Sequence, residues 1–144
     1  MIGDPTRPET VLRHRPPVLL VDRVAAVEPG RRLEARWRVP EDWSILAGHF
    51  PGEPIVPGVM LVEAIAQASA LLAHATDPFD PATARMYLAT IERARFLERV
   101  GPGDVLDVLT RLTGRKGPLW RFEGEVRRGG VLVAAAAISA ALRR

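Results

Sequence analysis

The 144-residue chain contains no cysteine, which excludes disulfides, thiolate nucleophiles and cysteine-ligated metals. Aromatic residues are few, at 6%, and the basic residues are scattered along the chain, so nucleic acid is a poor candidate partner. Lysine is nearly absent too, because Lys116 is the one lysine among 20 basic residues. Two explanations fit this arginine bias: codon usage, or a basic patch for an acidic partner.

No sorting signal or long apolar run directs the chain to a membrane. The N-terminal residues lack a basic segment followed by an apolar stretch, so they do not resemble a signal peptide. The apolar run 59–73 is short for a bilayer and contains Glu63 and Gln67. We expect a soluble, cytoplasmic protein that does not bind membranes.

Motifs for several common chemistries are also missing. No serine lies in a nucleophile elbow, and the three histidines do not have the spacing of metal ligands. No glycine-rich phosphate loop is present. We therefore expect neither a bound metal nor a nucleotide.

Turn signals divide the sequence into strand-like runs around one helix. Runs 19–27 and 33–39 flank a Glu-Pro-Gly turn, which predicts a hairpin. Residues 59 to about 74 are rich in alanine and leucine and apolar nearly all round, which predicts a buried helix. Further strand-like runs follow at 86–91, 95–97, 105–112, 119–126 and 131–142.

The secondary structure of two further stretches is less directly given by the sequence pattern. Four alanines at 134–137 favour a helix by propensity, but Gly129-Gly130 makes a good hairpin turn with the preceding run, so we predict a strand. Residues 40–58 are expected to be irregular, because five of the eight residues in 51–58 are proline or glycine.

These elements predict a single α+β domain over residues 1–144. Because the helix has no polar face, the antiparallel sheet must wrap around it. Residues 1–10 are polar and proline-rich, and we expect them to form a loose N-terminal arm.

One histidine and one carboxylate carry the candidate chemistry. His49 lies between Gly48 and a Phe-Pro-Gly segment that constrains its backbone, and imidazole can take and return a proton near neutral pH. Glu63 is the one acidic or strongly basic side chain between Pro54 and Ala75. A carboxyl in apolar surroundings is costly unless it is paired or protonated, and a protonated one can act as an acid. A structural histidine and a carboxylate satisfied by backbone groups or an ion pair are the alternatives.

Other residues complete a candidate site around this pair. Gln67 lies one helical turn after Glu63 on the same face and could hydrogen-bond to it. Gly58 precedes the helix, so a free backbone N–H there could polarise a carbonyl or hold an enolate. Apolar side chains such as Ile55 and Val59 suit a hydrophobic substrate.

At these residues the sequence resembles a known family. The segment Gly48–Gln67 resembles the signature of the FabZ-like 3-hydroxyacyl-[acyl-carrier-protein] dehydratases of type II fatty acid synthesis, which have the hotdog fold. Residues 14–24 resemble the family's opening segment, 94–96 and 102–104 its later strand and turn, and Trp120 its penultimate-strand aromatic. The resemblance extends over roughly residues 11–142.

The resemblance implies a long buried helix wrapped by a curved antiparallel sheet, in homodimers that are commonly assembled as trimers of dimers. It implies dehydration of (3R)-3-hydroxyacyl thioesters to trans-2-enoyl thioesters, in fatty acid or polyketide synthesis, without a cofactor. The catalytic residues would be His49 from one chain and Glu63 from the other. Phe50, Ile55, Val59 and Gln67 would line the substrate site with Gly58, and Tyr87 resembles a tunnel-gating tyrosine.

The implied partner is an acyl carrier protein. Such proteins are acidic, so a basic rim should steer their docking. The candidates are Arg93, Arg95 and Arg99, which precede a Gly-Pro-Gly turn.

Two alternatives remain open on the sequence alone. One is another thioester enzyme of the same fold, such as an enoyl-CoA hydratase or a thioesterase, although the pairing of His49 with Glu63 argues against a thioesterase. The other is a non-catalytic acyl-binding subunit of a dehydratase complex, which the presence of both residues disfavours.

Overall fold

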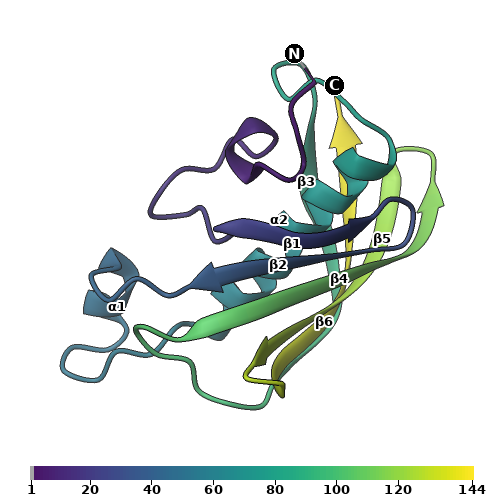
Figure 1. The fold of residues 1–144 in the computed structure, drawn as a ribbon. Coiled ribbons are helices and arrows are strands. Elements are labelled where there is room, and N and C mark those ends of the chain that lie inside the picture. Colours follow the sequence, from purple (N-terminus) through teal and green to yellow (C-terminus); the bar gives the residue numbers. More distant parts are fainter. Residues whose placement is uncertain (1) are drawn as a thin grey trace.

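The computed structural model describes residues 2–144 as one six-stranded antiparallel sheet with a long helix. The elements are η1 (Pro8–Thr10), β1 (Arg23–Glu28), β2 (Arg32–Arg38), α1 (Ser44–Gly48), α2 (Gly58–Thr76), β3 (Arg85–Phe96), β4 (Val105–Lys116), β5 (Leu119–Arg128) and β6 (Val131–Arg143). The strand order is β1-β2-β4-β5-β6-β3, so β1 and β3 form the two edges. The sheet curves around α2 (Figure 1).

The core lies between α2 and the inner face of the sheet. Alternate residues of β5, including Trp120, Phe122 and Val126, are buried, as the two-residue period of a strand requires. They face buried residues of α2 such as Ile65 and Leu72. The alternating burial on the strands and the apolar character of the helix are therefore both explained by a sheet that packs around one helix.

Most of the predicted elements are confirmed. The Glu-Pro-Gly turn joins β1 to β2 in an antiparallel hairpin, the buried helix is α2, and the alanine-rich run 134–137 is part of β6. The first strand starts at Arg23 and not at Leu19. One reason is that the Leu20 N–H donates to the Gln67 side chain and not to a neighbouring strand.

Two details of the expectation were wrong. The run 86–91 and residues 95–96 belong to one continuous strand, β3, with register shifts after Leu88 and after Ile91. These irregularities break the alternation that marks a strand in the sequence. A short helix, α1, also occupies part of the segment expected to be irregular, since proline and glycine become dense only after it ends.

Helix α2 is long and apolar enough to cross a membrane by length and composition alone. However, 61% of this apolar stretch of the helix is buried inside the fold, as in the core helix of a globular domain. The helix is also longer than the run expected from the sequence, because it continues to Thr76.

One stripe of α2 is left uncovered by the chain. Val59 is 70% exposed, and Glu63, Ala66 and Ala70 are partly exposed, whereas most of the residues between them are buried. Positions three or four apart lie on one face of a helix. The sheet therefore encloses α2 except along one mostly apolar face that carries Glu63.

Residues 2–10, for which the sequence predicts a loose arm, contact the body of the domain. Pro8 is buried, and the Ile2 carbonyl lies 2.6 Å from Nε2 of the buried His74 on α2. Thr10 hydroxyl and Asp4 backbone groups hydrogen-bond to each other. The looseness of this arm in solution stays a prediction.

Close packing of helix and sheet requires glycine at position 124. A Cβ atom there would overlap the Ile65 side chain of α2, so Gly124→Ala should reduce the free energy of unfolding by about 1–3 kcal/mol, as overpacked cores do. Gly114→Ala in the adjacent strand β4 is the matched control, because its Cβ would have its nearest neighbour at 3.8 Å. Urea unfolding of both variants measures the effect. Equal stabilities would show that α2 does not pack on β5 as described.

Candidate active site

His49 lies at the base of a closed turn that follows α1. The Ile55 N–H donates to the His49 carbonyl at 2.8 Å, and Phe50 and Glu53 exchange backbone hydrogen bonds within the turn. The Val56 N–H donates to the Val100 carbonyl, which joins the end of the turn to the segment between β3 and β4. The prolines and these hydrogen bonds together constrain the backbone of residues 49–56.

The His49 ring has one of its two nitrogens engaged by the same turn. Nδ1 lies 2.8 Å from the Ile55 carbonyl oxygen. Because a carbonyl can only accept, Nδ1 must carry the proton, and in the neutral ring Nε2 is left with a free lone pair. The ring also stacks on Phe50 with centroids 4.1 Å apart. His49 is therefore oriented as a proton acceptor through Nε2.

The turn leads directly into the N-terminus of α2. Pro57 is the N-cap residue and provides no side-chain cap, so the first backbone N–H groups of the helix are not satisfied by it. Gly58 is the first helical residue, and a Cβ there would lie 2.9 Å from the Phe96 ring. The absence of a side chain lets β3 pack tightly against this helix end.

Glu63 is held by Gln67, as the sequence predicts. Gln67 Nε2 donates to Glu63 Oε2 at 2.9 Å and to the Val18 carbonyl at 2.8 Å. Gln67 Oε1 accepts from the Leu20 N–H at 2.8 Å. The buried amide thus anchors the carboxylate to the segment before β1.

His14 is a neighbour of Glu63 that the sequence analysis did not identify. Its Nε2 lies 3.7 Å from Glu63 Oε2. The two residues are far apart in the sequence, so no local spacing could reveal the contact. The available signal was the place of His14 at the start of the segment that resembles the family's opening.

The described residues do not bring His49 and Glu63 together within one chain. The contacts of His49 are with Phe50 and Ile55, and those of Glu63 are with Gln67 and His14. No hydrogen bond or ion pair within residues 2–144 joins the two groups. Among the described residues the two groups therefore have separate sets of contacts. After the roles proposed below, we call His49 with its turn the base half, and Glu63 with Gln67 and His14 the acid half.

Three of the predicted substrate-binding side chains lie at exposed positions, whereas Gln67 is buried. Phe50 is 51% exposed, Val59 70% and Tyr87 52%, while Ile55 is half-buried in the His49 turn. Tyr87 lines a mostly apolar groove of about 370 Å³ with His14, Phe79 and Met86. The groove therefore reaches from β3 to the acid half.

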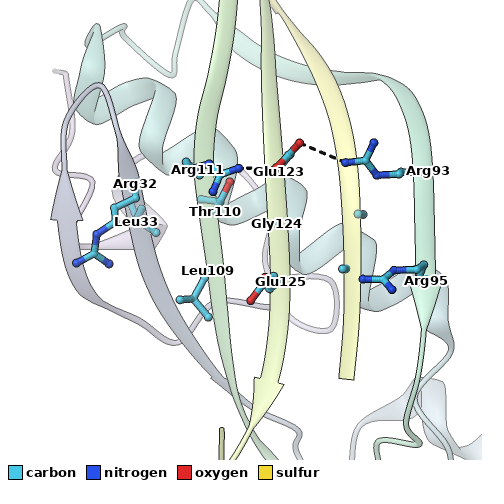
Figure 2. A pocket seen from close by; sticks show the side chains of 12 residues that line it. Arg32, Leu33, Arg93, Arg95, Leu109, Thr110, Arg111, Glu123, Gly124 and Glu125 are labelled. Atoms are coloured by element: carbon cyan, nitrogen blue, oxygen red, sulfur yellow. Dashed lines mark hydrogen bonds and ion pairs between the residues drawn. The ribbon is translucent and has the colours of Figure 1, made fainter. Parts of the chain in front are cut away.

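The three arginines proposed to bind a partner lie in different surroundings. Arg99 forms an ion pair of 3.2 Å with Glu53 in the His49 turn. Arg93 and Arg95 instead lie on the outer face of the sheet, where they line a groove of about 350 Å³ and Arg93 pairs with Glu123 (Figure 2). Arg99 is the one of the three with a contact to the His49 turn.

A curved antiparallel sheet that wraps around one long helix defines a hotdog-fold protein. The turn that carries His49 immediately precedes this helix. The chain belongs to the FabA-like domain family, whose profile matches residues 12–137. It is 45% identical over 136 residues to a 3-hydroxyacyl-[acyl-carrier-protein] dehydratase FabZ of Anaeromyxobacter sp. (strain Fw109-5), covering 93% of this chain and 86% of the relative. It is 41% identical to the FabZ of Myxococcus xanthus (strain DK1622), covering 86% and 81%.

Solved structures support the same fold. The dehydratase heterocomplex ApeI:P from Xenorhabdus doucetiae matches with a TM-score of 0.79 and 20% identity, covering 95% of this chain and 91% of that one. A fluoroacetyl-CoA thioesterase, FlK, matches with a TM-score of 0.66 and 15% identity, covering 82% and 89%. At these identities the likeness concerns the fold alone.

Proposed function

We propose that the protein catalyses the dehydration of (3R)-3-hydroxyacyl-[acyl-carrier-protein] thioesters to trans-2-enoyl thioesters. The observation that carries the proposal is the hydrogen bond from His49 Nδ1 to the Ile55 carbonyl, which leaves Nε2 available as a base beside the N-terminus of α2. The identity of 45% to a FabZ dehydratase over most of both chains supports the same reaction.

The chemistry needs one base, one acid and one oxyanion donor. His49 Nε2 removes the proton from C2 of the thioester, and the electron pair moves toward the carbonyl oxygen as an enolate develops. The Gly58 N–H stabilises that oxygen. The C2–C3 double bond forms as the C3–O bond breaks, and Glu63 protonates the departing hydroxyl, which leaves as water. These groups supply every step, so the proposal includes no cofactor.

The two catalytic groups come from different chains in this proposal. The long edge strand β3 is exposed along most of its length and displays Leu88, Ile91 and Phe96 to solvent. An unpaired apolar edge favours pairing with another chain. Pairing of two β3 strands in a homodimer would cover this edge and the uncovered stripe of α2. The β3 edges and α2 stripes of the two chains would then meet at one interface, with each Glu63 facing the partner subunit. Three such dimers could assemble into a trimer of dimers.

The proposal also assigns the remaining residues and the location. Phe50, Ile55 and Val59 would contact the acyl chain beside the base, and Tyr87 would border its path. A cytoplasmic location accords with the burial of α2, the described helix with the length and composition to span a membrane.

Removing either catalytic group should abolish turnover without unfolding the protein. General acids and bases each contribute about 10²- to 10⁴-fold, so His49→Ala and Glu63→Ala should lower kcat by that range. Dehydration is followed by the absorbance of the enoyl thioester, and circular dichroism checks the fold. Glu98→Gln, which removes an exposed carboxylate, is the control. A variant that kept more than about a tenth of wild-type turnover would contradict the role given to that residue.

Mixing the two inactive variants tests the shared site. Co-expressed His49→Ala and Glu63→Ala chains form mixed dimers, each with one intact site and one doubly deficient site. Random pairing makes about half of the dimers mixed, so about a quarter of wild-type activity should return, from the symmetry of an isologous dimer. Native mass spectrometry checks that mixed dimers form. If they form and activity stays near zero, both groups must act within one chain.

Charge reversal tests the docking of the acidic carrier protein. Arg99→Glu should raise KM for an acyl-carrier-protein substrate by about three- to tenfold and weaken its salt dependence, since charges at the rim of an interface mainly govern association. Arg93→Glu and Arg95→Glu, on the outer face of the sheet, should have smaller effects. A small acyl-pantetheine substrate is the control. Equal losses with both substrates would place Arg99 in the catalytic machinery or indicate misfolding.

A further inference from the structure

We propose that His14 is a positioning residue for Glu63, and that His14 and Gln67 together leave Oε1 of Glu63 as the oxygen that carries the transferable proton. The inference rests on the proposed dehydratase function, in which Glu63 protonates the departing hydroxyl. It identifies Oε1 as the Glu63 oxygen that donates the proton, and His14 and Gln67 as the residues that direct the proton to that oxygen.

The orientation of the Gln67 amide is determined by two backbone groups. The Leu20 N–H needs an acceptor and the Val18 carbonyl needs a donor, so Oε1 of Gln67 faces Leu20 and Nε2 faces Val18. Gln67 is 1% exposed, and a flipped amide would lose both bonds. The backbone around Gln67 therefore fixes the direction in which Nε2 donates its N–H to Glu63 Oε2.

The proton position on His14 follows from burial. Nδ1 of His14 is buried and has no hydrogen-bond partner among residues 2–144. A buried N–H without an acceptor is rarer than an unpaired acceptor, so we assign no proton to Nδ1. The single proton of the neutral ring then lies on Nε2, which faces Glu63 Oε2 at 3.7 Å. This distance is too long for a hydrogen bond but a small rotation of either side chain would close it.

Two N–H groups therefore converge on the same carboxyl oxygen. A hydrogen on Oε2 would point toward the N–H hydrogens of Gln67 and His14 and be repelled by them. In this proposal the neutral carboxyl therefore carries its proton on Oε1. No residue within 2–144 forms a hydrogen bond with Oε1, which leaves it available to the substrate. After the proton is transferred, negative charge develops on the carboxylate, and both N–H groups stabilise that charge at Oε2.

A mutant cycle tests whether His14 acts through Glu63. His14→Ala should lower kcat by about tenfold or more, with KM changed less than about twofold, because it weakens one group worth at most about 10²- to 10⁴-fold. In a Glu63→Gln background the same substitution should have no further effect, since the two residues form one unit. His14→Gln, which returns an N–H near the position of Nε2, should recover part of the activity. Glu9→Gln, an exposed change in the same segment, is the control.

A substrate with a leaving group that needs no proton gives a second readout. Elimination from a 3-chloroacyl pantetheine requires His49 to remove the C2 proton, and the C3–Cl bond then breaks to release chloride. His14→Ala should eliminate chloride at the wild-type rate, while His49→Ala should not. A His14 with a merely structural role would slow both substrates together and would overturn the inference, as would additive losses in the mutant cycle.

The tautomer of His14 can be observed directly. The chain has three histidines, so ¹⁵N-histidine labelling and comparison with His14→Gln assign its signals. The expected spectrum is that of the Nε2–H tautomer, and the Nδ1–H tautomer would overturn the inference. Failure of the wild-type protein to dehydrate 3-hydroxyacyl thioesters would reject the proposed function itself. Wild-type activity with an unaffected His14→Ala variant would reject the role of His14 alone.

Discussion

The enclosure of α2 by the sheet is the constraint on which the rest of the structure depends. Most side chains of the helix are apolar, so its burial supplies much of the core, and the inner residues of β4, β5 and β6 pack on it. The fit is close enough to require glycine at position 124 opposite Ile65. This packing fixes the position of the α2 backbone on the sheet, and with it the positions from which the helix N-terminus and Glu63 project.

The position of His49, in the base half of the site, is determined in a different way. His49 belongs to no long helix or strand, and proline, glycine and backbone hydrogen bonds hold its turn in place. The same turn supplies the carbonyl of Ile55 that selects the ring tautomer. Because this turn leads directly into α2, His49 and the N–H groups at the start of the helix belong to one short, hydrogen-bonded segment. A short stretch of sequence thus contains most of the base half, which is why it can be recognised without a structure.

In the acid half, one contact of Glu63 could be predicted from the sequence and one could not. The hydrogen bond between Glu63 and Gln67 could be predicted, because residues one helical turn apart share a face. The contact with His14 could not, because it depends on how the segment before β1 passes over α2. The three arginines proposed to bind a partner show that neighbours in sequence can lie in different parts of the fold. Arg93, Arg95 and Arg99 are neighbours in sequence, but strand alternation places the first two on the outer sheet face, and Arg99 lies beyond the end of β3 next to the His49 turn.

The uncovered stripe of α2 connects folding to the proposed activity. A single chain could have buried Glu63 completely by covering this face, but a fully enclosed carboxyl could not reach a substrate. In the proposed homodimer, a face closed by a second subunit would avoid this conflict, because the interface would exclude water around Glu63 while a gap between the subunits would admit the acyl chain. The apolar side chains exposed along β3 and α2 would then serve two purposes, stability of the assembly and a dry lining for the substrate. Under the proposed function, dissociation of the subunits would separate acid from base, so catalysis and association would be lost together.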